Sequence, residues 1–216
     1  LYINGTGAMA DYNTVPWASY QNEITTVVIG NGVTTLGSKA FYLCRNLATV
    51  TIPNGVTTIG DYAFGDSSND YYSGNNKSLD SITLKNITTI GRYAFGYAIN
   101  LNLIEMKNIT TIREFAFIGC SELSAVNIDA VTVEKGAFES CTSLTAVTIG
   151  KRVKELLNYE NTNDYHNVFE YCNVLTSVTF ENTIGWNYKY SETSYSPIDV
   201  TPSGIAIFFR PLYLNA

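Results

Sequence analysis

Few residues of this chain have the types and spacing that catalysis requires. His166 is the only histidine, and it follows Asp164 in a polar stretch. A serine or cysteine nucleophile would need that imidazole within hydrogen-bond reach as its base, and the cysteines are expected inside the fold. Glu105 and Asp129 could lie on neighbouring strands, but a flat exposed surface does not raise the pKa of one carboxyl, as glycoside hydrolysis requires. The sequence therefore predicts no catalytic residue and no enzyme.

The cysteines are candidates for a metal site or a disulfide. All four occupy the same position of a repeated unit, and they are Cys44, Cys120, Cys141 and Cys172. That position faces the inside of a turn, so we expect buried free thiols. A zinc site needs converging ligands, which thiols spread along the chain do not supply, and a disulfide between Cys120 and Cys141 stays open. The repeated glycines lack the Lys and Ser or Thr of a phosphate-binding loop, so no cofactor is predicted.

Residues 33–52 are the clearest copy of the unit that positions these side chains. As a template the unit reads V-x-x-I-G-x-x-A-F-x-x-C-x-x-L-x-x-V-x-I. Its phenylalanine returns with a period of about 22 residues and two longer copies, at Phe41, Phe64, Phe95, Phe117, Phe138 and Phe169. A period in the twenties with L-x-x-V-x-I is typical of a leucine-rich solenoid. Alternate residues of that strand, such as Val50 and Ile52, are expected to point inward.

The predicted fold is a leucine-rich-repeat solenoid, α/β in class but rich in β structure, wound as a right-handed superhelix. Each unit supplies one strand, a second short extended stretch at V-x-x-I, and one or two helical turns at G-x-x-A-F-x-x-C. We expect Trp17 and Tyr20 to cover the open end of the first strand. The chain forms one domain with seven strands and six full turns, divided into an N-terminal cap (1–23), repeats (24–180) with insertions near 65–77 and 157–167, and a C-terminal cap (181–216).

The repeat also resembles a known family. It is similar to the leucine-rich repeats of BspA-like bacterial surface proteins, whose unit reads I-G-x-x-A-F-x-x-C-x-x-L-x-x-V-x-I-P. The first part of that unit is seen here from Ile59 to Phe64, and the second part from Cys44 to Pro53. The opening Gly5-Thr6-Gly7-Ala8-Met9-Ala10-Asp11-Tyr12 and Pro16-Trp17 fit the same family. Departures from the pattern are local: Arg113 and Leu157 replace the glycine, Val168 the alanine and Ala98 the cysteine. The resemblance implies export to the bacterial cell surface and attachment to macromolecules of a host or a neighbouring cell.

The charge of the chain disfavours a nucleic-acid partner, and its apolar runs are too short for a membrane span. The net charge is −6 with a pI of about 4.8, and only 13 lysines and arginines are present, so nucleic acid is not the expected partner. No apolar run approaches the roughly 18 residues of a membrane span. Because the sequence begins at Leu1 without a charged leader, we interpret it as a mature or trimmed segment.

The remaining candidates are surface residues. Outward strand positions near the middle of the array carry a patch of mixed charge, consisting of Lys85, Leu103, Glu105, Lys107, Asn127 and Asp129. The insertions carry tyrosines, which give large contact areas at low entropic cost, namely Tyr71, Tyr72, Tyr159 and Tyr165. Ordinary solvated strand surface and tolerated loop lengthening are the alternative interpretations.

These observations favour a non-catalytic, adhesin-like binding module at the cell surface or outside the cell. The expected ligand is a surface protein or glycan of a host or neighbouring cell, with no cofactor, and the module is expected to be a monomer. Two alternatives stay open: a structural spacer that displays another domain, and an ancillary glycan-binding module of a larger enzyme. Fold does not decide among them.

Overall fold

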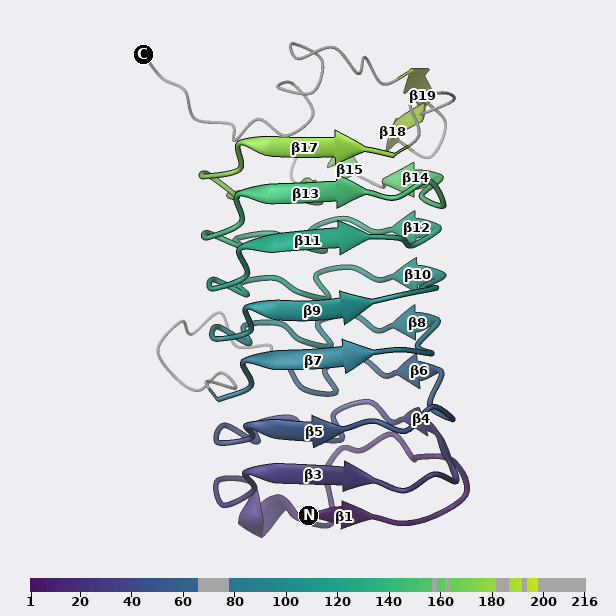
Figure 1. Cartoon of the computed structure of the whole chain (residues 1–216), viewed down its shortest axis with the longest axis vertical. Helices are drawn as coiled ribbons and strands as arrows, with labels where there is room; N and C mark the ends of the chain where they lie inside the picture. Colours follow the sequence, from purple (N-terminus) through teal and green to yellow (C-terminus); the bar gives the residue numbers. More distant parts are fainter. Residues whose placement is uncertain (66–77, 157–158, 162–163, 182–186, 192–193, 198–216) are drawn as a thin grey trace.

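The computed structural model describes residues 1–65, 78–156, 159–161, 164–181, 187–191 and 194–197. One face of the molecule, the front face in Figure 1, is formed by one strand from each turn of the chain. Seven of these strands belong to the repeats, and they are β3 (Thr26–Ile29), β5 (Thr49–Thr51), β7 (Ser81–Leu84), β9 (Leu103–Met106), β11 (Ala125–Ile128), β13 (Ala146–Ile149) and β17 (Ser177–Phe180). Inward and outward residues alternate along them, as in β9, where Ile104 and Met106 are buried while Leu103 and Glu105 are exposed. The seven predicted strands are confirmed.

The opposite face is a continuous parallel sheet of shorter strands. All of them except β2 (Gly7–Ala8), which precedes the first repeat, are the V-x-x-I stretch of one repeat, and this confirms the second extended segment. In sequence order they are β2, β4 (Val33–Leu36), β6 (Thr58–Ile59), β8 (Thr89–Ile90), β10 (Thr111–Ile112), β12 (Thr132–Val133) and β14 (Glu155–Leu156). Equivalent residues pair from one turn to the next, for example Thr58 with Thr89 and Ile59 with Ile90.

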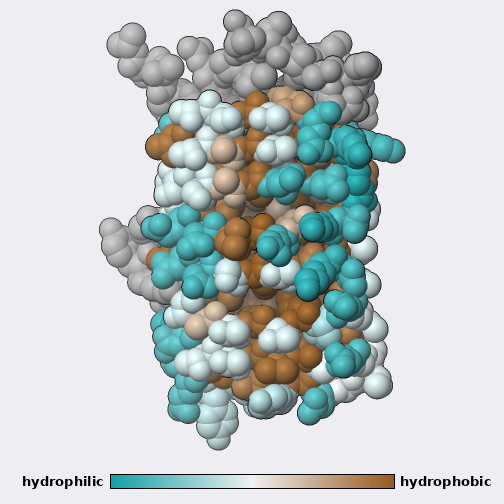
Figure 2. Space-filling model, in the orientation of Figure 1, coloured by the Kyte–Doolittle hydropathy of each residue, from teal (hydrophilic) through white to brown (hydrophobic). Residues whose placement is uncertain are grey.

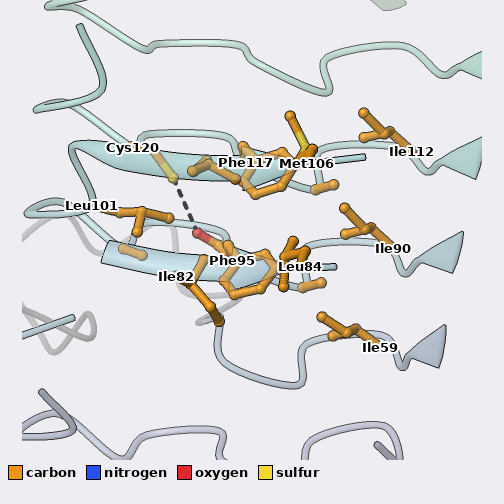
Figure 3. Packing of buried hydrophobic residues seen from close by; sticks show 14 of the residues in the cluster. Ile59, Ile82, Leu84, Ile90, Phe95, Leu101, Met106, Ile112, Phe117 and Cys120 are labelled. Atoms are coloured by element: carbon orange, nitrogen blue, oxygen red, sulfur yellow. Dashed lines mark hydrogen bonds between the residues drawn. The ribbon is translucent and has the colours of Figure 1, made fainter. Parts of the chain in front are cut away.

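The core lies between the two faces, and in it the residue at each repeat position stacks on the equivalent residue of the neighbouring turn. Successive phenylalanine rings of the repeat are 5.1 to 5.7 Å apart and nearly parallel, from Phe41 through Phe169. Figure 3 shows Phe95 and Phe117 one above the other, with Ile90 and Ile112 of the back strands beside them. Strand pairing sets a spacing of about 4.8 Å, close to the distance at which aromatic rings stack favourably. The aromatic column and the sheets therefore share one repeat distance.

The predicted helical turn is wrong. Within the described residues the only helix is a 3-10 turn, η1 (Ala18–Tyr20), and G-x-x-A-F-x-x-C forms a series of tight turns. In the first copy, the N–H of Cys44 donates to the oxygen of Phe41 (3.2 Å), but the N–H of Phe41 donates to Ala63 of the next turn (2.7 Å). Lys39 adopts a φ of 59°, a left-handed conformation that ends a right-handed helix. Hydrogen bonds between turns replace those of a helix.

The first 23 residues form an incomplete extra turn of the solenoid. β1 (Tyr2–Ile3) pairs in parallel with β3, and β2 pairs with β4. Trp17 takes the place of the repeat phenylalanine: its ring stacks on Phe41 with centroids 5.9 Å apart. Its Nε1–H donates to the oxygen of Ala40 at 3.0 Å. The capping role of Trp17 is confirmed, whereas Tyr20 is 60% exposed and covers little.

The Trp17 interaction predicts graded losses of stability. Trp17→Phe keeps the stacked ring but leaves the Ala40 carbonyl without its donor, which should cost about 1 kcal/mol. Trp17→Ala also removes the ring and should cost about 3 kcal/mol. Urea unfolding followed by circular dichroism measures both losses. Equal stability of the two variants would show that the ring contributes nothing to the cap.

The second insertion is an antiparallel hairpin rather than a loop. β15 (Tyr159–Asn161) pairs with β16 (Asp164–His166). A further hairpin follows the last repeat, formed by β18 (Asn187–Ser191) and β19 (Ser194–Pro197). These two strands and Glu181 are the described part of the predicted C-terminal cap. Residues 66–77 of the first insertion and 198–216 of the cap lie outside the described residues.

Candidate functional site

The predicted patch lies on the middle of the front face. β7 and β9 pair in register, so Ser81 lies beside Leu103 and Thr83 beside Glu105. Lys85 and Lys107 follow the ends of these two strands, and both are exposed. Leu103 is 55% exposed, although it lies within a strand. Figure 2 shows hydrophilic side chains on both sides of an apolar strip along this face.

Among the described residues, Asp129 is the member of the patch whose side chain forms an ion pair. Its Oδ2 lies 3.6 Å from Nη1 of Arg152, and Arg152 also donates to Oδ1 of Asn108 at 3.4 Å. Arg152 belongs to the turn of the next repeat, and the repeat pattern does not indicate that it reaches Asp129. This ion pair reduces the capacity of Asp129 to bind a ligand. Asn127, two residues before it on β11, is exposed.

The tyrosines of the insertions are not brought to this patch in the described structure. Tyr159 and Tyr165 lie on the β15–β16 hairpin, where Tyr159 pairs with His166. Figure 1 places that hairpin at the C-terminal end of the array, whereas the patch spans β7, β9 and β11. Tyr71 and Tyr72 lie outside the described residues. The candidate residues therefore form one patch and a separate hairpin.

A groove in the front face was not foreseen from the sequence. It lies between β5 and β7, has a volume of about 440 Å³, and includes Lys85 and Glu105 of the patch in its lining. Val50 and Ile52 are only half-buried beside it, whereas the equivalent Ile82 and Leu84 are buried. The feature of the sequence that could have indicated this groove is the first insertion, which lengthens the connection between these two strands.

A second column of stacked rings lies beside the core column. Tyr62 and Tyr93 are 5.1 Å apart, and Tyr93 and Phe115 are 5.0 Å apart. Arg92 lies over the Tyr93 ring at 5.5 Å and forms an ion pair with Glu114 at 3.4 Å. Burial raises the pKa of Tyr93. The faces of these rings cover one another, so the column offers ring edges rather than the open faces on which a sugar would stack.

The four cysteines are free and buried, as predicted. Three of the thiols donate to the phenylalanine carbonyl of the preceding turn, as Cys120 does to Phe95 at 3.3 Å; Figure 3 shows this bond. Burial raises the pKa of Cys44 to about 12 and also raises that of Cys120. The column is a structural element of the core.

This burial predicts slow chemistry at the thiols. With a pKa of about 12, roughly one Cys44 side chain in ten thousand is a thiolate at pH 8, and the thiolate is the reactive form. We expect iodoacetamide to leave the native protein unmodified at pH 8 and to modify all four cysteines in guanidinium. Mass spectrometry counts the adducts. Rapid alkylation of Cys44 in the native protein would contradict its burial.

In the described part of the chain, no group of three His, Cys, Asp or Glu residues could hold a metal ion. None of the helices in that part has the length and apolar character needed to cross a membrane.

Two parallel ladders, a continuous aromatic column and a period of about 22 residues define a leucine-rich-repeat solenoid. The family model described as "BspA type Leucine rich repeat region" matches residues 17–73 and 69–185 in six copies. The chain belongs to this family, which confirms the resemblance seen in the repeat. A comparison with curated proteins gives no significant match.

Solved structures of three bacterial proteins are similar to the chain. A leucine rich cell surface protein from Faecalibacterium prausnitzii is 18% identical with a TM-score of 0.40, over 77% of this chain and 62% of that one. A leucine-rich repeat protein from Bacteroides ovatus is 18% identical with a TM-score of 0.43, over 80% and 63%. The Leucine Rich Repeat protein of T. pallidum is 21% identical with a TM-score of 0.46, over 81% and 76%. The chain thus spans less than two thirds of the first two proteins.

Proposed function

We propose that this protein is a non-catalytic binding module of the bacterial cell surface, which attaches to a protein ligand through its front face. The observation that carries the proposal is the 55% exposure of Leu103 at the start of β9, on the face that also carries the exposed Lys85, Glu105 and Lys107. An exposed apolar side chain inside a polar rim is the usual arrangement of an interface anchor. Family membership and the cell surface description of the F. prausnitzii protein support the location.

Each part of the patch has a distinct role in this proposal. Leu103 supplies apolar contact, while Lys85 and Lys107, one turn apart, attract acidic groups and accelerate association. Glu105 and Asn127 provide polar contacts at the rim. Asp129 contributes less, because Arg152 neutralises it. The tyrosines at 71, 72, 159 and 165 are proposed as a secondary contact. The face-to-face stacking of Tyr62, Tyr93 and Phe115 favours a protein ligand over a glycan.

The test is binding of the purified chain to immobilised matrix proteins and glycans at low and physiological salt. For the protein ligand found, Leu103→Ser should weaken binding about tenfold by removing the anchor. Lys85→Glu combined with Lys107→Glu should slow association and reduce its salt dependence. Lys154→Glu, at an exposed lysine beside the back sheet, controls for each of the two charge reversals made singly.

A variant lacking residues 66–76 and 158–166 separates the contribution of the insertions. Binding that survives this deletion but is lost in Leu103→Ser places the contact on the front face. If the folded chain binds nothing in the panel, the structural spacer becomes the better interpretation.

A further inference from the structure

The front ladder is interrupted where the back ladder is continuous. Its strands form three separate sheets, β1-β3-β5, β7-β9 and β11-β13-β17. On the back face β6 and β8 of the same two turns pair directly. Among the described residues, no hydrogen-bonded bridge joins β5 to β7, and Figure 1 shows their wide separation. Two strand edges therefore face each other across the groove.

The direction of the backbone groups follows from the bonds that these strands make on their other sides. In a parallel ladder, the N–H and C=O of successive residues point alternately to the two neighbours. The N–H of Thr49 donates back to Thr25 (3.1 Å), so the groups of Val50 point toward β7. The N–H of Leu103 donates to Asp80 (3.3 Å), so those of Ser81 and Thr83 point toward β5. Donors and acceptors thus line both walls of the groove.

The side chains around the groove set a pattern for whatever fills it. On the inner side lie half-buried Val50 and buried Ile82, and on the outer side lie the exposed hydroxyl-bearing Thr51 and Thr83. An extended peptide with alternating apolar and polar residues matches both sides. Strand addition of this kind uses main-chain hydrogen bonds for affinity and alternate side chains for specificity.

We propose that this groove binds an extended peptide segment of a partner protein, added as a strand parallel to β5 and β7. The inference rests on the proposed function, and it specifies which part of a protein ligand is recognised. The front strands of the chain itself have the required alternation, so a peptide with the sequence of residues 144–150, Leu-Thr-Ala-Val-Thr-Ile-Gly, is a suitable probe. The added strand holds β5 and β7 at about two strand spacings, roughly 9.6 Å.

The experiment measures fluorescence anisotropy of the labelled heptapeptide titrated with the full chain. A matched peptide, N-methylated at the amides of Val147 and Thr148, keeps every side chain but removes one donor toward each wall. We expect saturable binding of the first peptide and at least about tenfold weaker binding of the second. Ser81→Pro removes a donor from the wall, and proline is tolerated at such an edge. It should weaken binding about tenfold, whereas Ser81→Ala, which keeps the N–H, should not.

Several outcomes would overturn the inference. They are equal binding of the two peptides, equal binding by folded Ser81→Pro, displacement of the peptide by chitohexaose, and no saturable binding up to about 1 mM. If Ser81→Pro fails to fold, the test is the comparison of the two peptides in their binding to the unmodified chain. Leu103 does not line the groove, so Leu103→Ser should bind the heptapeptide normally. Binding of Leu103→Ser to the panel of matrix proteins and glycans tests the proposed function, whereas its binding of the heptapeptide tests the groove. A failure of one proposal can therefore be distinguished from a failure of the other.

Discussion

Phe95→Ala is expected to lower the free energy of unfolding by about 3–5 kcal/mol. Phe95 is fully buried, and its ring stacks on Phe64 and Phe117, each 5.2 Å away. In a solenoid each turn contacts only its neighbours, so truncation here weakens two interfaces at once. Urea unfolding followed by circular dichroism and by tyrosine fluorescence measures the change. Divergence of the two probes would reveal that the array separates into halves at this turn.

Leu103→Ala is the matched control for this loss, because Leu103 belongs to the adjacent strand and is 55% exposed. Its truncation should change stability by no more than about 0.5 kcal/mol. A loss below about 1 kcal/mol for Phe95→Ala would show that the aromatic column adds little beyond strand pairing. The two substitutions also separate effects on stability from effects on binding, because Leu103 has the larger role in the proposed binding site.

Gly60→Ala is expected to destabilise the protein by about 3 kcal/mol, at the upper end of the range for overpacking. A Cβ at this position would lie 2.6 Å from the nitrogen of Ser38 and 2.7 Å from the carbonyl carbon of Gly37. Both are backbone atoms of the preceding turn, so neither can rotate away. The N–H of Gly60 also donates to Leu36 at 2.8 Å, which fixes the separation of the two turns. The change in urea midpoint measures the cost.

The chain contains its own control, because Arg113 occupies the equivalent position two turns later. Arg113→Ala keeps the N–H that donates to Ile90 at 3.0 Å, and the site already accommodates a Cβ. We expect a change within about 0.5 kcal/mol. A Gly60→Ala protein as stable as Arg113→Ala would mean that the turns can separate without cost, contrary to the close approach at Gly60.

The repeating part of the fold is predictable from residue spacing alone. Val126 and Ile128 follow Leu123 at L-x-x-V-x-I spacing, and all three are buried in the structure. Phe117 and Cys120 recur at fixed positions, which is sufficient to predict one aromatic and one thiol column. Such predictions succeed because an apolar residue that returns once per turn must stack on its own copy.

Features that depend on contacts between turns could not be predicted from residue spacing. The segment around Phe41 is not helical, because the N–H of Phe41 donates to the oxygen of Ala63 in the next turn of the solenoid. Arg152 reaches Asp129 from another repeat, and β5 parts from β7 while their back strands stay paired. The periodicity of the sequence shows which residues recur. It does not show with which neighbour each backbone group forms a hydrogen bond, or where an insertion separates two strands. The patch was therefore predictable from the sequence, whereas the groove beside it was not, since it exists only through the spacing of adjacent turns.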